Sequence, residues 1–231
     1  MPRLRTLLAA TIALVALASC SSCKSGTKST DGLPAGGELL RSSATAMRDI
    51  KTARFLITAD GTIAGLPLKR AEGVLTREGS AQGTAQVEQL GTTVELAFVI
   101  VGETIHLKGP TGGYQELPLA LASAVYDPSA ILDPDRGVAK VLGTATDAKT
   151  EGEETVEGQK AYRVAAKFPA ADLATVVPGV TGAVPGKVWI ASDNKRLLKA
   201  MFELPAVGDA KGGSVTVTFK EFDAPVSISA P

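Results

Sequence analysis

The sequence of 231 residues is poor in side chains that perform chemistry. It contains one histidine, His106, and two cysteines, Cys20 and Cys23, both near the amino terminus. A His/Cys metal site or a Cys–His nucleophile pair needs more such residues, distributed over the chain. The sequence has no G-x-S-x-G elbow and no glycine-rich phosphate loop after a predicted strand. It therefore predicts a protein that is not an enzyme and has no cofactor or metal.

An acidic run is the other feature that could serve acid–base or metal chemistry. It consists of Glu151, Glu153, Glu154 and Glu157. The run surrounds a predicted hairpin, and such a run is usually a solvated face. A carboxylate pair of a glycosidase and a calcium site stay open as alternatives. His106 has no partner that the sequence indicates, which favours a surface or packed histidine.

The sequence around Cys20 has a pattern that indicates a specific modification of this cysteine. Arg3 and Arg5 precede an apolar run over residues 7–18, and small residues follow, as in a secretory signal peptide. The run is too short to span a bilayer, which takes about 20 apolar residues. Leu17-Ala18-Ser19-Cys20 resembles a bacterial lipobox, where a thiol accepts the diacylglyceryl group. We therefore expect a signal peptide over residues 1–19 and a Cys20 that carries S-diacylglycerol and an N-acyl chain.

Other interpretations of this region stay open. One is an ordinary signal peptide beside a chance cysteine. Another involves Cys23, which lacks the apolar residue that a lipobox has three positions upstream and is left as a free thiol or a minor acylation site.

More than one acyl chain gives stable anchoring. The expected location is therefore the periplasmic side of the cell inner membrane, with part of the protein secreted or in the cell wall.

Composition divides the remaining chain into a tether and a domain. Residues 20–37 are rich in Ser, Gly, Lys and Thr without periodicity, which predicts a flexible tether. Residues 38–231 are expected to form a single domain, because 45% of the sequence is apolar and 21% is charged. The net charge is zero, and −2 after removal of residues 1–19, which argues against a nucleic-acid partner.

Hydrophobic periodicity predicts one helix and two runs of strands. Residues 38–48 have helical spacing. Alternation or turn signals predict strands at 52–63, 68–77, 84–90, 94–101, 104–108, 149–156, 160–168, 183–192, 197–204 and 214–222. Asp-Pro pairs at 127–128 and 133–134 predict short helices over 129–132 and 135–143, and another is expected at 170–177. The fold class is α+β, because there is no βαβ alternation.

The inward-facing side chains of the first run of strands are mostly small or aliphatic. A bent sheet with helices over its concave face can leave an apolar cavity between these layers. Such a cavity suits acyl chains, because burial contributes about 0.8 kcal/mol per methylene. From composition alone, a solid core is the favoured alternative. The candidate cavity residues are Phe55, Ile57, Ala85, Val87, Val94, Leu96 and Phe98.

Several motifs carry a resemblance over essentially the whole chain. They begin with the lipobox and with Ile63-Ala64-Gly65-Leu66-Pro67-Leu68-Lys69. The most specific is Tyr126-Asp127-Pro128-Ser129-Ala130-Ile131-Leu132-Asp133-Pro134, and others follow at 148–152, 157–159, 162–164 and 185–190. With these motifs, the sequence resembles the actinobacterial lipoprotein family of LppX, LprA, LprF and LprG, and most closely its LprG branch.

The resemblance implies a half-barrel of sharply bent antiparallel sheet with helices over the concave face, similar to the carriers LolA and LolB. It implies a lipid carrier whose cavity holds the acyl chains of triacylated glycolipids, namely phosphatidylinositol mannosides, lipomannan and lipoarabinomannan, and of triacylglycerol. Such a carrier moves lipid from the inner membrane to the outer envelope beside a major-facilitator efflux pump. With the resemblance, the cavity is favoured over the solid core.

Ala85 matches a cavity-facing valine of the family, and Val87 and Gln89 are predicted to share its face. Gln89 interrupts the apolar pattern, so it marks either a polar mouth or an error of one residue in the register. Besides the carrier, two classes of function stay open. One is a structural scaffold lipoprotein with a solid core, and the other is a lipid hydrolase, which needs a nucleophile and a base.

Overall fold

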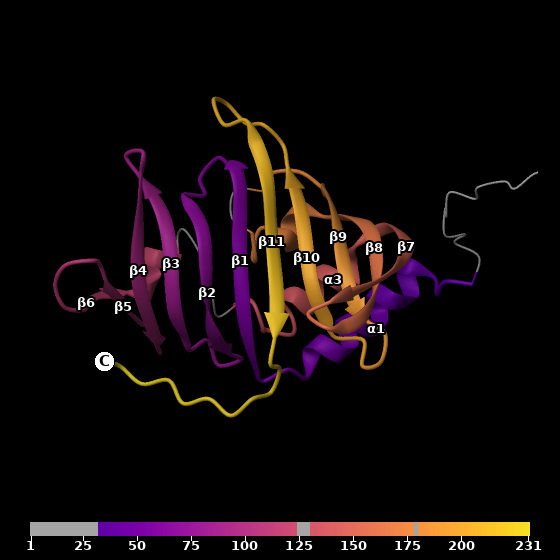
Figure 1. Ribbon diagram of the computed structural model, residues 1–231, viewed down its shortest axis with the longest axis horizontal. Helices are drawn as coiled ribbons and strands as arrows, with labels where there is room; N and C mark the ends of the chain where they lie inside the picture. The colour runs from indigo at the N-terminus through magenta and orange to yellow at the C-terminus, as the bar shows by residue number, and fades with distance from the viewer. Residues whose placement is uncertain (1–31, 124–129, 178–179) are drawn as a thin grey trace, which may run out of the picture.

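The computed structural model describes residues 32–123, 130–177 and 180–231. The predicted lipidation site at Cys20, the signal peptide and most of the tether lie outside these residues. The fold is a single open antiparallel sheet of 11 strands, in the order β6-β5-β4-β3-β2-β1-β11-β10-β9-β8-β7. Helices lie against one face of this curved sheet (Figure 1). The predicted α+β class and the open, bent antiparallel sheet are confirmed.

Each half of the sheet is a meander of neighbouring strands. The first half contains β1 (Thr52–Thr62), β2 (Leu68–Thr76), β3 (Ala81–Gln89), β4 (Thr92–Val101), β5 (Thr104–Lys108) and β6 (Gln115–Pro118). The second half contains β7 (Thr146–Val156), β8 (Gln159–Phe168), β9 (Val184–Ala191), β10 (Leu197–Leu204) and β11 (Gly212–Lys220). Alternation of apolar residues gives most strands one inward face, as in β1, where Phe55 and Ile57 are buried beside more exposed neighbours.

The two meanders join at the centre of the sheet through their first and last strands. β1 pairs with β11 in antiparallel register, with Phe55 opposite Phe219 and Ile57 opposite Val217. These cross-strand pairs place apolar residues from distant parts of the sequence on the same concave face. The inward residues of both halves therefore face one common interior.

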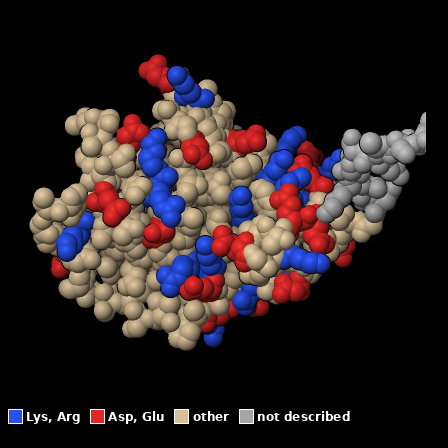
Figure 2. Space-filling view, in the orientation of Figure 1, with Lys and Arg blue, Asp and Glu red and all other residues tan. Residues whose placement is uncertain are grey.

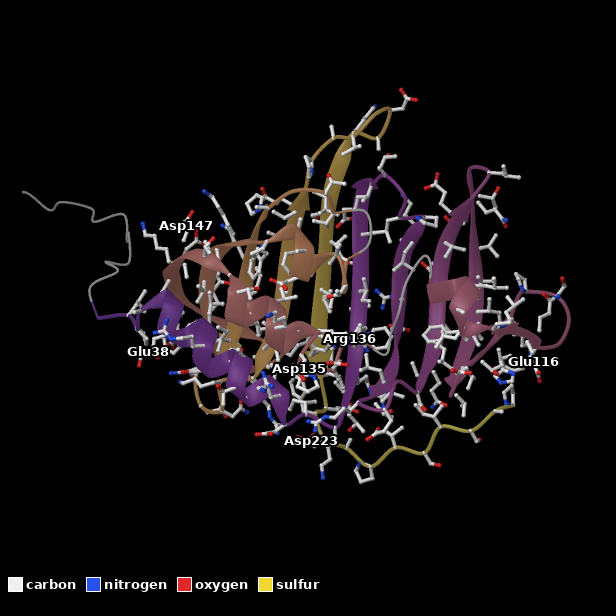
Figure 3. All side chains as sticks on the ribbon, turned by 180° about the vertical axis from the view of Figure 1, so that it is seen from behind. Glu38, Glu116, Asp135, Arg136, Asp147 and Asp223 are labelled. Carbon is white, nitrogen blue, oxygen red and sulfur yellow. The ribbon has the colours of Figure 1, made fainter. Side chains whose placement is uncertain are left out.

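Two helices cover the β7–β9 end of the concave face. Helix α1 (Gly36–Arg48) contacts β7, β8 and β9, and α3 (Val138–Thr144) packs against α1 and β8. Gly36 allows the start of α1 to approach β7 closely, since a side chain there would meet the backbone of Ala148 and Lys149 at 2.9 Å. The short helices α2 (Leu119–Ser123) and α4 (Ala170–Leu173) lie beside β5–β6 and α3, respectively. Seen from behind, α1 and α3 cross one half of the sheet (Figure 3).

Several predicted boundaries are wrong for local physical reasons. The turn expected at 91–93 is a tighter one at Leu90-Gly91, where both residues have positive φ, 51° and 76°. The apolar run that begins at Leu117 belongs partly to β6, which was not predicted. Asp133 accepts hydrogen bonds from the backbone of Asp135 and Arg136 but caps a turn, and α3 begins only after Gly137. The expected helix at 129–132 falls partly outside the described residues.

A pair of glycines shapes the first meander. Gly73 of β2 lies opposite Gly83 of β3, in a row that continues to Phe55 on one side and Phe98 on the other. A side chain at Gly83 would overlap the carbonyl oxygen of Glu72, and one at Gly73 would overlap that of Gln82. Glycine in a strand interior marks such close backbone approach. The two positions also leave the concave face without side chains between two aromatic rings.

Ser43 of α1 gives a prediction about the packing of the helices. Its side chain is fully buried, and its hydroxyl has no hydrogen-bond partner. An unpaired buried hydroxyl retains its desolvation cost, so Ser43→Ala is expected to raise the free energy of unfolding by about 1 kcal/mol. Urea denaturation measures this change. The matched control is Ser42→Ala at the half-buried neighbouring position, and a Ser43→Ala variant no more stable than this control contradicts the prediction.

Candidate functional site

The main feature of the interior is an apolar cavity of about 380 Å³ between the concave face of the sheet and the helices. Among the described residues, every side chain that lines it is Ala, Val, Leu, Ile, Pro or Phe. Well-packed cores contain few voids larger than a water molecule, and ligand sites in proteins have volumes of roughly 300–1,000 Å³. The layers therefore do not meet in a solid core, and the hollow between them has the size of a ligand site.

Most of the predicted cavity residues do line this hollow. Phe55 and Ile57 project from β1, Ala85 and Val87 from β3, and Leu96 and Phe98 from β4. Ala85 is opposite Ala71 of β2 and Leu96 of β4, so two alanines are paired at the middle of this wall. These side chains share one face because strand residues at i and i+2 point the same way.

Val94 was predicted in the same set, but it is not among the lining residues. It pairs with Val87 in the register of β3 and β4 and lies two positions closer to the turn than Leu96. Gln89 pairs with Thr92 and is exposed at the end of β3. β3 thus continues beyond the cavity. The last residues on the concave side of the β3–β4 pair contact solvent or neighbouring side chains and do not line the cavity.

The far wall of the cavity was not predicted. It is formed by the second meander and by α3, which supplies Val138, Val141 and Leu142. Alternation in residues 184–191 and 197–204 indicated which residues share a face. Assigning that face to the cavity required knowing that both meanders form one sheet. The lining residues of the second meander are Phe168, Val188, Leu197, Ala200, Phe202, Val215, Val217 and Phe219.

The burial of the lining residues differs between the two ends of the cavity. At the β8–β10 end, Phe168, Val188 and Phe202 are each at most 4% exposed, and the Phe168 and Phe202 rings pack edge to face at 5.1 Å. Over β3–β5, by contrast, burial is uneven, because Val87 and Leu107 are only half-buried whereas Ile100 is 3% exposed. The cavity is therefore closed beneath α1 and α3, and it is more accessible toward β3, β4 and β5.

Glu151 and Glu154 of the acidic run lie on the outer face of the sheet, away from the cavity. Arg163 pairs with Glu151 and Glu154, and Lys187 lies 3.2 Å from Glu151. Burial raises the pKa of Glu151, but hydrogen bonds and charge attraction from Lys187 and Arg163 outweigh it, so this pKa lies below its ordinary value. Figure 2 shows charged side chains gathered over this end of the face. The geometry is that of a network of ion pairs.

His106 also faces outward, on β5 between residues that line the cavity. The residue is 6% exposed, and its Nδ1 atom lies 3.7 Å from Glu116 on β6. No group of three or more His, Cys, Asp or Glu side chains able to hold a metal ion occurs within residues 32–123, 130–177 and 180–231. Over the same ranges, no helix is long and apolar enough to cross a membrane.

The fold is an open antiparallel half-barrel with helices over an apolar cavity, and proteins of known structure share it. The structure superposes on LprF from Mycobacterium bovis with a TM-score of 0.73 and 24% identity, covering 85% of this chain and 96% of that one. It superposes on LppX from Mycobacterium tuberculosis with a TM-score of 0.63 and 19% identity, covering 84% of this chain and 97% of the other. These likenesses support the fold.

Sequence comparison identifies the family within that class. The model of the LppX_LprAFG lipoproteins matches residues 35–228, and the chain belongs to this family. The lipoarabinomannan carrier protein LprG of Mycolicibacterium smegmatis is 31% identical over 97% of this chain and 93% of its own length. LprG of M. tuberculosis is 30% identical, over 99% and 95%, respectively. The resemblance found in the sequence motifs is confirmed.

Proposed function

We propose that the protein is a lipid carrier that buries acyl chains in the apolar cavity. The observation that carries this proposal is the cavity of about 380 Å³ lined by apolar side chains. Each methylene moved from water into such a site contributes about 0.8 kcal/mol, so a long chain supplies enough free energy to leave a membrane transiently. Among the described residues, no polar side chain lines the cavity, so a sugar or phosphate headgroup stays outside in water.

The names of the relatives support a glycolipid as cargo. LprG is named a lipoarabinomannan carrier, and LprF of M. bovis, 26% identical over 97% of this chain, is named a putative diacylated glycolipid transporter. For this chain we propose triacylated glycolipids (phosphatidylinositol mannosides, lipomannan and lipoarabinomannan) and triacylglycerol. Their chains would enter from the β3–β5 side and extend toward the closed end at Phe168 and Phe202.

The proposed mechanism is passive shielding at the cell envelope. Lipidated Cys20 holds the domain on the periplasmic side of the inner membrane through the residues that precede helix α1. No bond is broken during transport, so the protein is not an enzyme. Direction would come from a major-facilitator efflux pump as partner, or from the difference in lipid affinity between donor and acceptor.

Native mass spectrometry tests the carrier against the scaffold. The chain without residues 1–19 is expressed in a mycobacterial host and measured without detergent. Bound glycolipid or triacylglycerol at defined stoichiometry is the expected result. A clean mass of the protein alone contradicts the carrier and favours the scaffold. Turnover of an ester substrate that is lost on substitution of one serine would instead favour the hydrolase.

A further inference from the structure

The cavity reaches the surface of the protein beside the loop that joins β1 and β2. Among the described residues that line the cavity, only Pro67 of this loop is exposed. Its carbonyl oxygen accepts a hydrogen bond of 2.8 Å from the backbone of Glu88, which attaches the loop to the end of β3. Figure 1 shows this loop and the tip of the β3–β4 hairpin at the same end of the sheet. We call the opening beside Pro67 and Val87 the mouth of the cavity.

The concave side of the β3–β4 hairpin changes from apolar to polar beyond the mouth. Ala85, Val87 and Leu96 on this side line the cavity. The next residue of β3 with the same orientation is Gln89, and it pairs with Thr92 of β4. Directly opposed residues of antiparallel strands have Cβ atoms about 5 Å apart, so the amide and the hydroxyl can contact the same ligand group. Both lie about 7 Å beyond Val87, at roughly 3.4 Å per residue.

Both of these polar side chains are available to a ligand. Gln89 and Thr92 are exposed, and neither side chain forms a hydrogen bond with another of the described residues. The amide supplies two N–H donors and a carbonyl acceptor, and the hydroxyl both donates and accepts. Sugar hydroxyls also donate and accept, so this pair offers them partners of both kinds.

The charged side chains of the hairpin lie on its outer face and already have partners. Glu88 forms an ion pair of 2.9 Å with Lys69, and Glu95 accepts a hydrogen bond of 3.2 Å from Gln86. Residues 81–101 contain no Lys or Arg. A phosphate group at the tip would therefore meet no cation of the hairpin, and two carboxylates would repel it. The uncharged pair on the concave side suits the neutral hydroxyls of a sugar instead.

We propose that Gln89 and Thr92 bind the sugar of a glycolipid headgroup by hydrogen bonds while an acyl chain occupies the cavity. This inference rests on the proposed carrier function, because it assigns the headgroup contact of that same site. Ligand sites combine apolar walls with a few placed polar groups that fix orientation and give specificity. The apolar lining holds the chain, and the polar pair distinguishes a glycolipid from a lipid that has the same chains but no sugar.

Competition between two lipids measures this preference. Monogalactosyl diacylglycerol and diacylglycerol with identical acyl chains differ only in the sugar, and equal amounts of both are offered to the full chain in detergent micelles. Native mass spectrometry gives the ratio of the two bound lipids. The parent chain is expected to bind the glycolipid roughly tenfold better, as two net hydrogen bonds would produce.

A double variant tests the two residues directly. Gln89→Ala combined with Thr92→Val removes the amide and the hydroxyl, so the ratio is expected to fall to about one while the loading of diacylglycerol alone stays unchanged. The matched control combines Gln82→Ala with Thr93→Val. These are exposed residues of the same types on the outer face of the same two strands, opposite Val99 and Glu88, respectively. The control should keep the parental ratio.

The outcomes separate the headgroup contact from the carrier function. A parental ratio near one, an unchanged ratio in the double variant, or an equal fall in the control overturns the headgroup contact. Preference of the parent for phosphatidic acid over the glycolipid also overturns it, because the pair is assigned to a neutral group. In each of these cases a parent that loads diacylglycerol still supports the carrier. A parent that loads none of the lipids counts against the carrier and the headgroup contact together.

Discussion

Ala85→Trp is expected to abolish the co-purification of lipid while the domain still folds. Residue 85 projects from β3 into the cavity between Ala71 and Leu96, so an indole ring there occupies the space in which acyl chains are proposed to lie. The added ring enters existing free volume, so the cost of overpacking should stay at or below the 1–3 kcal/mol typical of a filled core. Mass spectrometry of the purified protein measures the lipid, and thermal unfolding measures the fold.

Thr84→Trp is the matched control for this variant. Thr84 is the neighbouring residue of the same strand and, opposite Glu72 and Ala97, belongs to the outer face. It receives the same ring without filling the cavity, so its lipid content should equal that of the parent. Unchanged lipid loading in Ala85→Trp would contradict the assignment of the cavity as the lipid site.

Phe168→Ala is expected to produce the largest loss of stability. Phe168 is fully buried at the closed end of the cavity, with its ring edge to face with Phe202, and both rings lie over Gly186. Truncation of a buried phenylalanine removes its transfer free energy and leaves a void, which costs about 3–5 kcal/mol. Urea denaturation of the lipid-free protein measures the change.

Phe222→Ala is the comparison, because this half-buried ring packs against Phe219 and Arg196 but does not line the cavity. We expect it to lose less stability than Phe168→Ala. If lipid enters the enlarged cavity of Phe168→Ala, binding to the folded state should recover part of the loss. Equal losses in the two variants would mean that the closed end of the cavity is not close-packed.

Local sequence pattern was sufficient to predict most of the strands of the fold. Period-two alternation located ten of the strands and identified Phe55, Ile57, Ala85 and Val87 as one inward face. β6 was missed because its four residues are all exposed and lack an inward-facing pattern. The turn at Leu90-Gly91 was misplaced, because leucine is not expected at a position with positive φ.

Long-range pairing limited the prediction of the site. The far wall depends on β1 pairing with β11, across a separation in sequence that no local pattern reveals. Composition also favoured a solid core, because the distance between helices and sheet is set by tertiary packing. The resemblance to a family, carried by motifs such as residues 126–134, was what favoured a cavity before its walls were known.

The pairing of β1 with β11 has a consequence for how the protein folds. β11 lies between β1 and β10, so the sheet stays in two separate halves until residues 212–220 are in place. Closing such a long loop makes folding slow relative to the formation of either meander. The walls of the cavity come from both halves, so the cavity forms only in this late step. A partly synthesised or partly exported chain would therefore lack the cavity proposed to hold lipid.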